Sequence, residues 1–180
     1  MTAHDQDHAA RHVAGEPDAL GTFSQNTTLS VIGLGVGASK PTTVIFSNVI
    51  AEEVDIGDAV YLRFEIPVDY SGGDIIVRAH VVTMSAESGK EANFQIDYKT
   101  ASIGDVMSGT TATKTTGDLN LPASQYQHFH GDMTISEADL AGKGCVHVKL
   151  TRIALVGGAD PAANPGILCV SFIYTANRVI

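Results

Sequence analysis

Two stretches near the end of the chain decide the fold, Cys145-Val-His-Val-Lys-Leu-Thr-Arg152 and Ile167-Leu-Cys-Val-Ser-Phe-Ile-Tyr174. Both are rich in β-branched and aromatic residues and alternate in polarity, as β-strands do. The segment between them, Gly157-Gly-Ala-Asp-Pro-Ala-Ala-Asn-Pro-Gly166, consists of turn-forming residues. Two strands joined by a loop of this kind, without a catalytic motif, predict the end of a β-sandwich.

The same alternation continues upstream. Val60, Leu62, Phe64 and Ile66 share one face of a segment whose other face is polar. We expect eight or nine strands; besides the two above they are Thr27–Gly33, Thr42–Ile50, Asp58–Pro67, Ile75–Thr83, Glu91–Lys99, Gly109–Gly117 and Tyr126–Ile135. The Thr-rich Gly109–Gly117 is expected at a sheet edge, Ala51–Gly57 as an acidic corner, and Ser136–Gly142 as a single helical turn or tight corner. This spacing predicts an all-β protein, an antiparallel β-sandwich that is jelly-roll-like.

The first 25 residues differ from the rest. Residues 1–25 contain three of the seven histidines and no period-2 alternation, so we expect an extended N-terminal arm. Residues 26–180 are expected to form the β-sandwich domain. The run Gly33-Leu-Gly-Val-Gly37 lacks the spacing and the following helix of a phosphate-binding loop, and it is interpreted as a hinge between arm and domain.

Composition and charge exclude several classes of function. The formal net charge is −9, and the eleven basic residues are scattered singly, which argues against nucleic-acid binding. No apolar run is long enough for a membrane span. The N-terminus also lacks the pattern of a signal peptide, so we expect folding in a cytoplasm. In that compartment Cys145 and Cys169 are expected to be buried free thiols, although a bridge is conceivable if their strands are neighbours.

Two groups of histidines raise the question of a metal site. His4, His8 and His12 are spaced by four residues, but no apolar stripe would hold such a helix on a core. His128 and His130 lie on one side of a strand, as metal ligands do in cupin-like jelly rolls, with Glu137 and His147 as imaginable partners. The preferred interpretation is an outward-facing histidine pair at an interface; a cupin-type metalloenzyme is the alternative. We expect no cofactor and no metal.

A pattern-level resemblance covers roughly residues 58–175. The chain resembles the small β-sandwich proteins that decorate or cement the heads of tailed bacteriophages. The resemblance lies in Phe64-Glu-Ile-Pro-Val-Asp-Tyr-Ser-Gly-Gly-Asp-Ile-Ile-Val77, the Glu91–Lys99 strand, and Val146–Arg152 followed by Ile167–Tyr174. It implies a non-enzymatic virion component on the capsid surface, often a homotrimer, whose partner is the major capsid protein.

Recognition is expected to use the arm and the loops, because loops and arms carry recognition on a rigid scaffold. The residues expected to contact a partner are His4, His8, His12, Phe23, Tyr70, Asp74, Asp160, Pro161 and Asn164. The alternative function is a jelly-roll module that binds a glycan or receptor on a phage tail or fibre. The chain has no tryptophan, so a stacking platform for sugars would depend on its tyrosines, of which Tyr98 is expected in the core by its alternation; they are Tyr61, Tyr70, Tyr98, Tyr126 and Tyr174.

Overall fold

The computed structural model describes residues 23–30 and 40–176, and almost all regular structure in them is β. The strands are β1 Phe23–Ser30, β2 Thr42–Phe46, β3 Val49–Glu53, β4 Ala59–Glu65, β5 Ile75–Val82, β6 Glu91–Ala101, β7 Ala112–Asn120, β8 His128–Ile135, β9 Cys145–Ile153 and β10 Gly166–Ala176. One short helix, α2 Glu137–Leu140, follows β8. No helix in these residues is long and apolar enough to cross a membrane.

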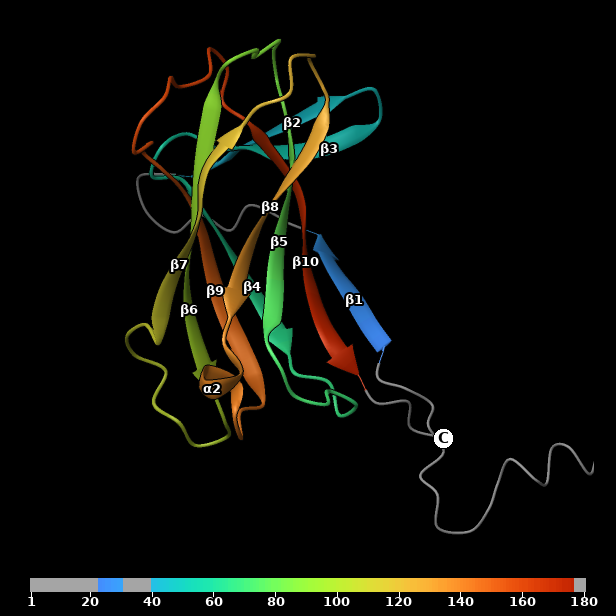
Figure 1. The fold of residues 1–180 in the computed structure, drawn as a ribbon, viewed down its shortest axis with the longest axis vertical. Coiled ribbons are helices and arrows are strands. Elements are labelled where there is room, and N and C mark those ends of the chain that lie inside the picture. The colour runs from blue at the N-terminus through green and yellow to red at the C-terminus, as the bar shows by residue number, and fades with distance from the viewer. Residues whose placement is uncertain (1–22, 31–39, 177–180) are drawn as a thin grey trace, which may run out of the picture.

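The strands form two antiparallel sheets that face each other (Figure 1). One sheet has the order β2-β3-β10-β5-β8, with β1 also paired to β10, and the other has the order β4-β9-β6-β7. From β3 onward the pairs are nested, since β3 pairs β10, β4 pairs β9, β5 pairs β8 and β6 pairs β7. This folded-over arrangement is a jelly roll. The predicted fold class is therefore confirmed, and the Thr-rich strand β7 lies at a sheet edge as expected.

The core lies between the sheets and follows the alternation of the sequence. Phe94, Ile96 and Tyr98 of β6 are inaccessible or nearly so. Phe64 of β4 stacks on Phe172 of β10 with ring centroids 4.5 Å apart, so one aromatic pair joins the two sheets. Apolar side chains from both sheets fill the space around this pair, as they do in β-sandwiches generally.

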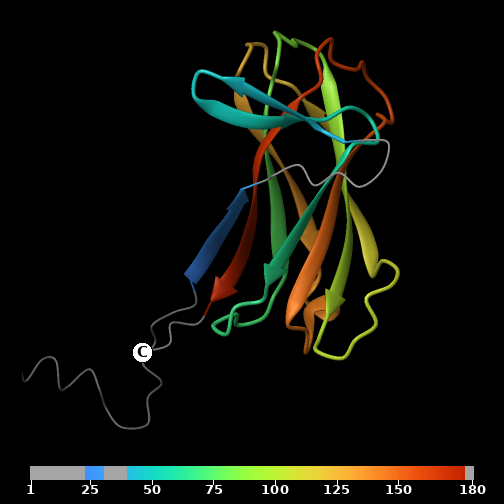
Figure 2. The same ribbon diagram turned by 180° about the vertical axis from the view of Figure 1, so that it is seen from behind.

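The loops gather at the two ends of the sandwich (Figures 1 and 2). We call the upper end in Figure 1 the long-loop end; it is formed by residues 54–58, 83–90, 121–127 and 154–165. The opposite end, which contains α2, is the helix end and is formed by residues 66–74, 102–111 and 136–144. A strand of eight residues separates the ends by roughly 25 Å.

One predicted strand is a hairpin instead. The segment expected as a single strand, Thr42–Ile50, turns at Ser47 and Asn48, which have φ angles of 45° and 69°. Two successive residues with positive φ make the tight turn that suits twisted hairpins.

The segment expected as an acidic corner was also wrong at Glu52, which belongs to β3 and is 3% exposed. Its carboxylate accepts hydrogen bonds from the Thr43 hydroxyl of β2, which allows a charged residue to be buried there.

The N-terminal strand also starts earlier than expected. Phe23, Ser24 and Gln25, which the sequence assigned to the arm, pair with Ala176, Thr175 and Tyr174 of β10. The rest of the expected arm and the Gly33–Gly37 hinge lie outside the described residues.

The expected helical turn is present as α2, but the Ser136 side chain does not cap it, because its hydroxyl donates a hydrogen bond to the carboxylate of Asp139.

The two cysteines belong to different sheets. Cys145 is in β9 and Cys169 is in β10, and both thiols are free. They are half-buried, which corrects the expectation of full burial. Cys145 is paired with Glu65 and Cys169 with His80, so each lies opposite a polar residue of the neighbouring strand.

Candidate functional site

A hollow lies on the outer face of the four-stranded sheet, beside the loop that joins β6 to β7. It is a groove of about 580 Å³. We call it the sheet groove; it is lined by Tyr61, Leu62, Asp97, Tyr98, Lys99, Met107, Gly109, Thr110, His147, Val148 and Lys149. Strands β4, β6 and β9 supply its floor, and the 102–111 loop supplies Met107, Gly109 and Thr110 as its wall.

Strand register brings three residues of the groove, Tyr61, Lys149 and Asp97, into one row. Tyr61 of β4 is paired with Lys149 of β9, Lys149 with Asp97 of β6, and Asp97 with Thr113 of β7. Paired residues of antiparallel strands point to the same face, so this row crosses the outside of the sheet from one edge to the other. The inward neighbour of Tyr61, Val60, is completely buried, as period-2 alternation requires.

Two side chains give the sheet groove apolar surface. Tyr61 is 42% exposed and Met107 is 51% exposed. A phenol ring held on a strand is a rigid surface with a polar tip, and methionine adapts its shape to what it contacts. Together they offer apolar contact in a hollow whose other exposed side chains are mostly polar.

The polar groups of the sheet groove are only partly used within the protein. Oδ1 of Asp97 accepts hydrogen bonds from Gln95 (3.0 Å) and Thr113 (2.7 Å). The side chains of Lys99, Lys149 and His147 make no hydrogen bond or ion pair with any other described residue. The groove therefore contains donors that remain available to a ligand.

A second hollow continues the first along the strands. Its volume is about 490 Å³, and it shares Met107 and His147 with the sheet groove. Arg63 and Glu65 line it and form an exposed ion pair of 2.9 Å with each other. The two hollows together make an extended depression, which suits an elongated ligand better than a compact one.

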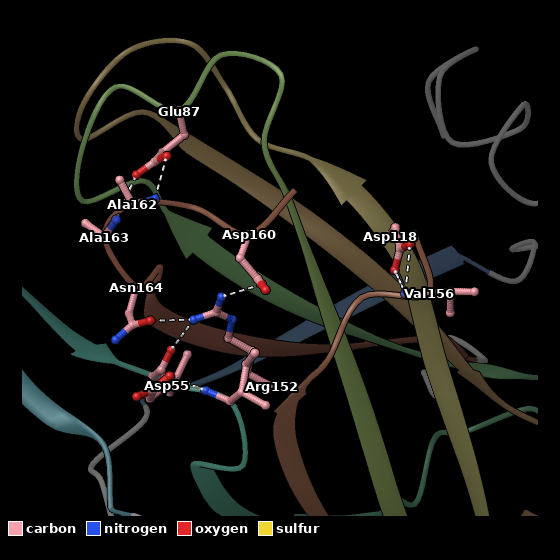
Figure 3. Close-up of polar contacts among 11 residues, drawn as sticks. Asp55, Glu87, Asp118, Arg152, Val156, Asp160, Ala162, Ala163 and Asn164 are labelled. Carbon is pink, nitrogen blue, oxygen red and sulfur yellow. Dashed lines mark hydrogen bonds and ion pairs between the residues drawn. The ribbon is translucent and has the colours of Figure 1, made fainter. Parts of the chain in front are cut away.

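The loop residues expected to bind a partner have internal contacts at the long-loop end (Figure 3). Arg152, 2% exposed, donates hydrogen bonds to Oδ1 of Asn164 (2.6 Å), to Oδ1 of Asp160 (3.2 Å) and to the Val54 carbonyl (3.2 Å). Pro161 is half-buried beside Asp160. Asp160 and Asn164 thus help to hold the 154–165 loop, and their role in binding stays a prediction.

Glu87 fixes the same loop from another side (Figure 3). Its carboxylate is 2% exposed and accepts hydrogen bonds from the backbone N–H groups of Ala162 and Ala163, both at 3.0 Å, and from the Ser85 hydroxyl. Burial alone would raise the pKa of Glu87, but these hydrogen bonds outweigh it and lower the pKa below its ordinary value. A buried carboxylate that stays ionised here binds the loop firmly to the sandwich.

The other expected contact residues lie at the helix end. Tyr70 donates a hydrogen bond from its hydroxyl to the Gly73 carbonyl, and its backbone is bridged to Ala176. Asp74 accepts the N–H of Glu137 (2.9 Å), so it caps α2 in place of Ser136. The backbone of Phe23 also pairs with Ala176, which brings Phe23 and Tyr70 to the same end.

The expected contact residues therefore divide between opposite ends of the sandwich. Phe23, Tyr70 and Asp74 are at the helix end, and the others that are described are at the long-loop end. His4, His8 and His12 lie outside the described residues. The sheet groove contains none of these nine residues. The alternation of residues along each strand predicted outward-facing positions for Tyr61, Asp97 and Lys99. Only the pairing of β4, β9 and β6 brings these residues together.

The two strand histidines face outward from the six-stranded sheet, as expected. His128 and His130 are exposed, and His128 stacks on His80 of β5 with centroids 5.2 Å apart. Nδ1 of His80 lies 3.0 Å from Nε2 of His128, and Nε2 of His80 lies 2.9 Å from the Ser171 hydroxyl. Burial, then His128, lowers the pKa of His80. This cluster faces away from the four-stranded sheet.

In the described part of the chain, the metal site expected in the cupin-like alternative is absent, because Glu137 and His147 do not lie beside His128 and His130. His147 belongs to β9 of the other sheet, and Glu137 lies beyond the far end of β8, at the helix end. Within residues 23–30 and 40–176, no three His, Cys, Asp or Glu side chains are grouped in a way that could hold a metal ion.

Comparison with known proteins supports the fold. No protein-family model matches the sequence, and no curated protein matches it. Among solved structures, the chain is similar to a xylan-binding module, CBM15, with a TM-score of 0.50 and 19% sequence identity over 86% of this chain and 97% of that chain. At this identity the similarity establishes the jelly-roll fold alone.

Weaker similarities are found with two further solved structures. The CBM36-1 domain of a multidomain xylanase from the hindgut metagenome of Trinervitermes trinervoides gives a TM-score of 0.40 at 12% identity, over 87% of this chain and all of that domain. A chain of infectious bursal disease virus, Gx strain, gives 0.40 at 11% identity, over 86% of this chain and 32% of the viral chain.

Proposed function

We propose that this protein is a non-catalytic jelly-roll binding module that holds a glycan in the sheet groove, as a receptor- or glycan-binding part of a phage tail or fibre. One observation carries the proposal. An exposed tyrosine ring stands in register with Lys149 and Asp97 in an open, extended hollow on a rigid sheet. Rigid sheets keep such a set of groups in place without ordering on binding.

The chemistry of the groove suits a sugar. A pyranose ring has an apolar C–H face, which packs on an aromatic ring, and a rim of hydroxyls, which both donate and accept hydrogen bonds. Tyr61 and Met107 supply the apolar contact. Lys99 and Lys149 donate hydrogen bonds, and the carboxylate of Asp97 accepts them. The jelly roll is also the fold of the xylan-binding module described above, which makes it compatible with polysaccharide binding.

The test is a binding measurement with a matched pair of tyrosine variants. The full chain is titrated with a panel of oligosaccharides by calorimetry. We expect Tyr61→Ala to weaken the best ligand by about tenfold or more, because loss of a ring–sugar contact removes roughly 1–3 kcal/mol. Tyr126→Ala is the control, since Tyr126 is similarly exposed (46%) but lies at the long-loop end. Equal effects of the two substitutions, or no sugar binding, would contradict the proposal.

A second candidate function is attachment to a capsid, favoured by the β2–β3 hairpin. The hairpin crosses the long-loop end of the sandwich (Figure 2). It exposes Ile45 (74%), Ile50 (59%) and Val49 (39%). Strand β2 is at the edge of its sheet, and exposed apolar residues on an edge strand favour pairing with another protein.

In this second proposal the partner is the major capsid protein, the assembly is a homotrimer, and the protein is on the capsid surface. Co-sedimentation with capsid shells tests it. The double variant Ile45→Ser, Ile50→Ser should lose binding, because both side chains are on the exposed hairpin. Tyr61→Ala should bind as the wild type does. Retention of binding by the hairpin variant would exclude the hairpin as the docking element.

A further inference from the structure

We infer that the sheet groove selects an anionic sugar, one that has a carboxylate or sulfate group on the ring. The inference rests on the proposed glycan-binding function and names the charge class of the ligand. It starts from the charges in the groove. Lys99, Lys149 and His147 line it, while Asp97 is its single carboxylate.

The lysines of the sheet groove form no ion pair within the described residues, although Lys99 interacts electrostatically with Asp105 of the 102–111 loop, which does not line the groove. The ion pairs within the described residues use Arg63, Arg78, Lys143 and Arg152 as their cations. Neither Lys99 nor Lys149 is among them. Asp97 lies across from Lys149 in the strand register and two residues from Lys99, yet it forms an ion pair with neither. Its Oδ1 is bound instead by Gln95 and Thr113.

This local charge is opposite to that of the whole chain. The protein has a formal net charge of −9, whereas the charged side chains that line this hollow are two lysines and one aspartate, with His147 beside them. Both lysines are half-buried, as expected for lysines whose alkyl chains pack on the protein surface while their ammonium groups stay in solvent. A hollow with an excess of positive charge concentrates the field that acts on an anionic ligand. The effect attracts an anion and gives a neutral sugar no comparable advantage.

The arrangement fits a charged pyranose. Its ring would pack on Tyr61, its hydroxyls would meet Asp97, and its acidic group would lie between Lys149 and Lys99, on the two central strands of the groove. A carboxylate and a sulfate present the same negative oxygens to an ammonium group. The shared chemistry is therefore an anionic substituent on the sugar ring, and the two sources are separated by experiment.

The experiment compares three probes by calorimetry at low and at high salt: oligogalacturonate, a heparin oligosaccharide and neutral xylo-oligosaccharide. We expect one or both anionic probes to bind at least tenfold more tightly than the neutral probe at low salt. Binding of oligogalacturonate alone would identify a uronate, and binding of heparin alone a sulfated sugar. Salt should weaken the anionic probes and leave the neutral probe unchanged, because screening acts on charge.

Charge-removing variants assign the effect to the groove. Lys99→Gln and Lys149→Gln should each weaken the anionic probe on the order of fivefold and leave the neutral probe unchanged. Lys114→Gln is the control, because Lys114 is exposed on the same sheet but does not line the groove. An equal loss in all three variants would overturn the inference in favour of general attraction between charges.

The two proposals fail in different ways. If the neutral probe binds as tightly as the anionic ones and depends on Tyr61, the groove binds glycans but does not select an anion, and the inference is wrong. If no probe binds, both the inference and the proposed function are wrong.

Discussion

The long-loop end and the sheet groove both contain many polar side chains, but they use them in opposite ways. At the long-loop end Arg152 and Glu87 are buried and bonded to the 154–165 loop. In the groove the side chains of Lys99 and Lys149 form no hydrogen bond or ion pair with any other described residue. Buried and paired polar groups hold a structure together, whereas exposed and unpaired ones are available for recognition. Under our proposal, the loops of the long-loop end contribute stability and the four-stranded sheet contributes binding.

The largest expected effect is on the long-loop end. Arg152→Ala should lower the free energy of unfolding by about 3 kcal/mol, because it leaves Asn164 and the Val54 carbonyl without their donor. Urea denaturation measures this. Arg63→Ala is the control, since Arg63 is 58% exposed and paired only with exposed Glu65, and it should change little. A similar loss of unfolding free energy in the two variants would contradict the stabilising role of the buried Arg152.

A smaller effect is expected for Glu87→Gln, and it should depend on pH. The pKa of Glu87 is lower in the folded chain than in the unfolded one, so its ionised form stabilises the fold above the ordinary carboxyl range. That stabilisation is lost as pH falls through the folded pKa. The variant should be less stable by about 2 kcal/mol at neutral pH and should approach the wild type in acid. Thermal unfolding across pH measures it, and a pH-independent difference would contradict the role of the charge.

Groove substitutions should change stability still less. The combined variant Tyr61→Ser, Lys99→Gln, Lys149→Gln removes exposed or half-buried groups without internal hydrogen bonds, so we expect a loss of less than about 1 kcal/mol. Its glycan affinity should nevertheless be abolished. Denaturation and calorimetry on the same sample test both parts. A large loss of stability would mean that these residues are structural.

The smallest expected effect concerns His80 on the six-stranded sheet. Burial and the neighbouring His128, Arg78 and His130 lower its pKa, while Asp132 opposes them. The unfolded chain therefore takes up this proton first, and stability should fall as pH drops through the ordinary histidine range. His80→Asn should reduce this slope. Thermal unfolding between neutral and mildly acidic pH measures the slope in both proteins, and an unchanged slope would exclude His80 as its source.

The fold could be predicted because alternation is local. Phe94, Ile96 and Tyr98 follow one another at every second position, and the core buries all three. The β2–β3 hairpin was missed because its turn has no glycine, and Ser47 and Asn48 between apolar residues read as a continuous strand.

The candidate site could not be predicted in the same way. Tyr61, Asp97 and Lys149 are distant in sequence, and nothing in their local patterns states that β9 lies between β4 and β6. Register decides which outward residues become neighbours. The loop residues Asp160 and Asn164 looked available because the burial of their partner, Arg152, depends on the packing of the long-loop end.

The most direct measurement is amide hydrogen exchange of the full chain with and without the anionic probe, oligogalacturonate or the heparin oligosaccharide, that binds more tightly in calorimetry. Our account predicts added protection in β4, β6, β9 and the 102–111 loop, and no change in the 154–165 loop or the β2–β3 hairpin. Protection confined to the 154–165 loop or the hairpin, or none anywhere, would contradict it.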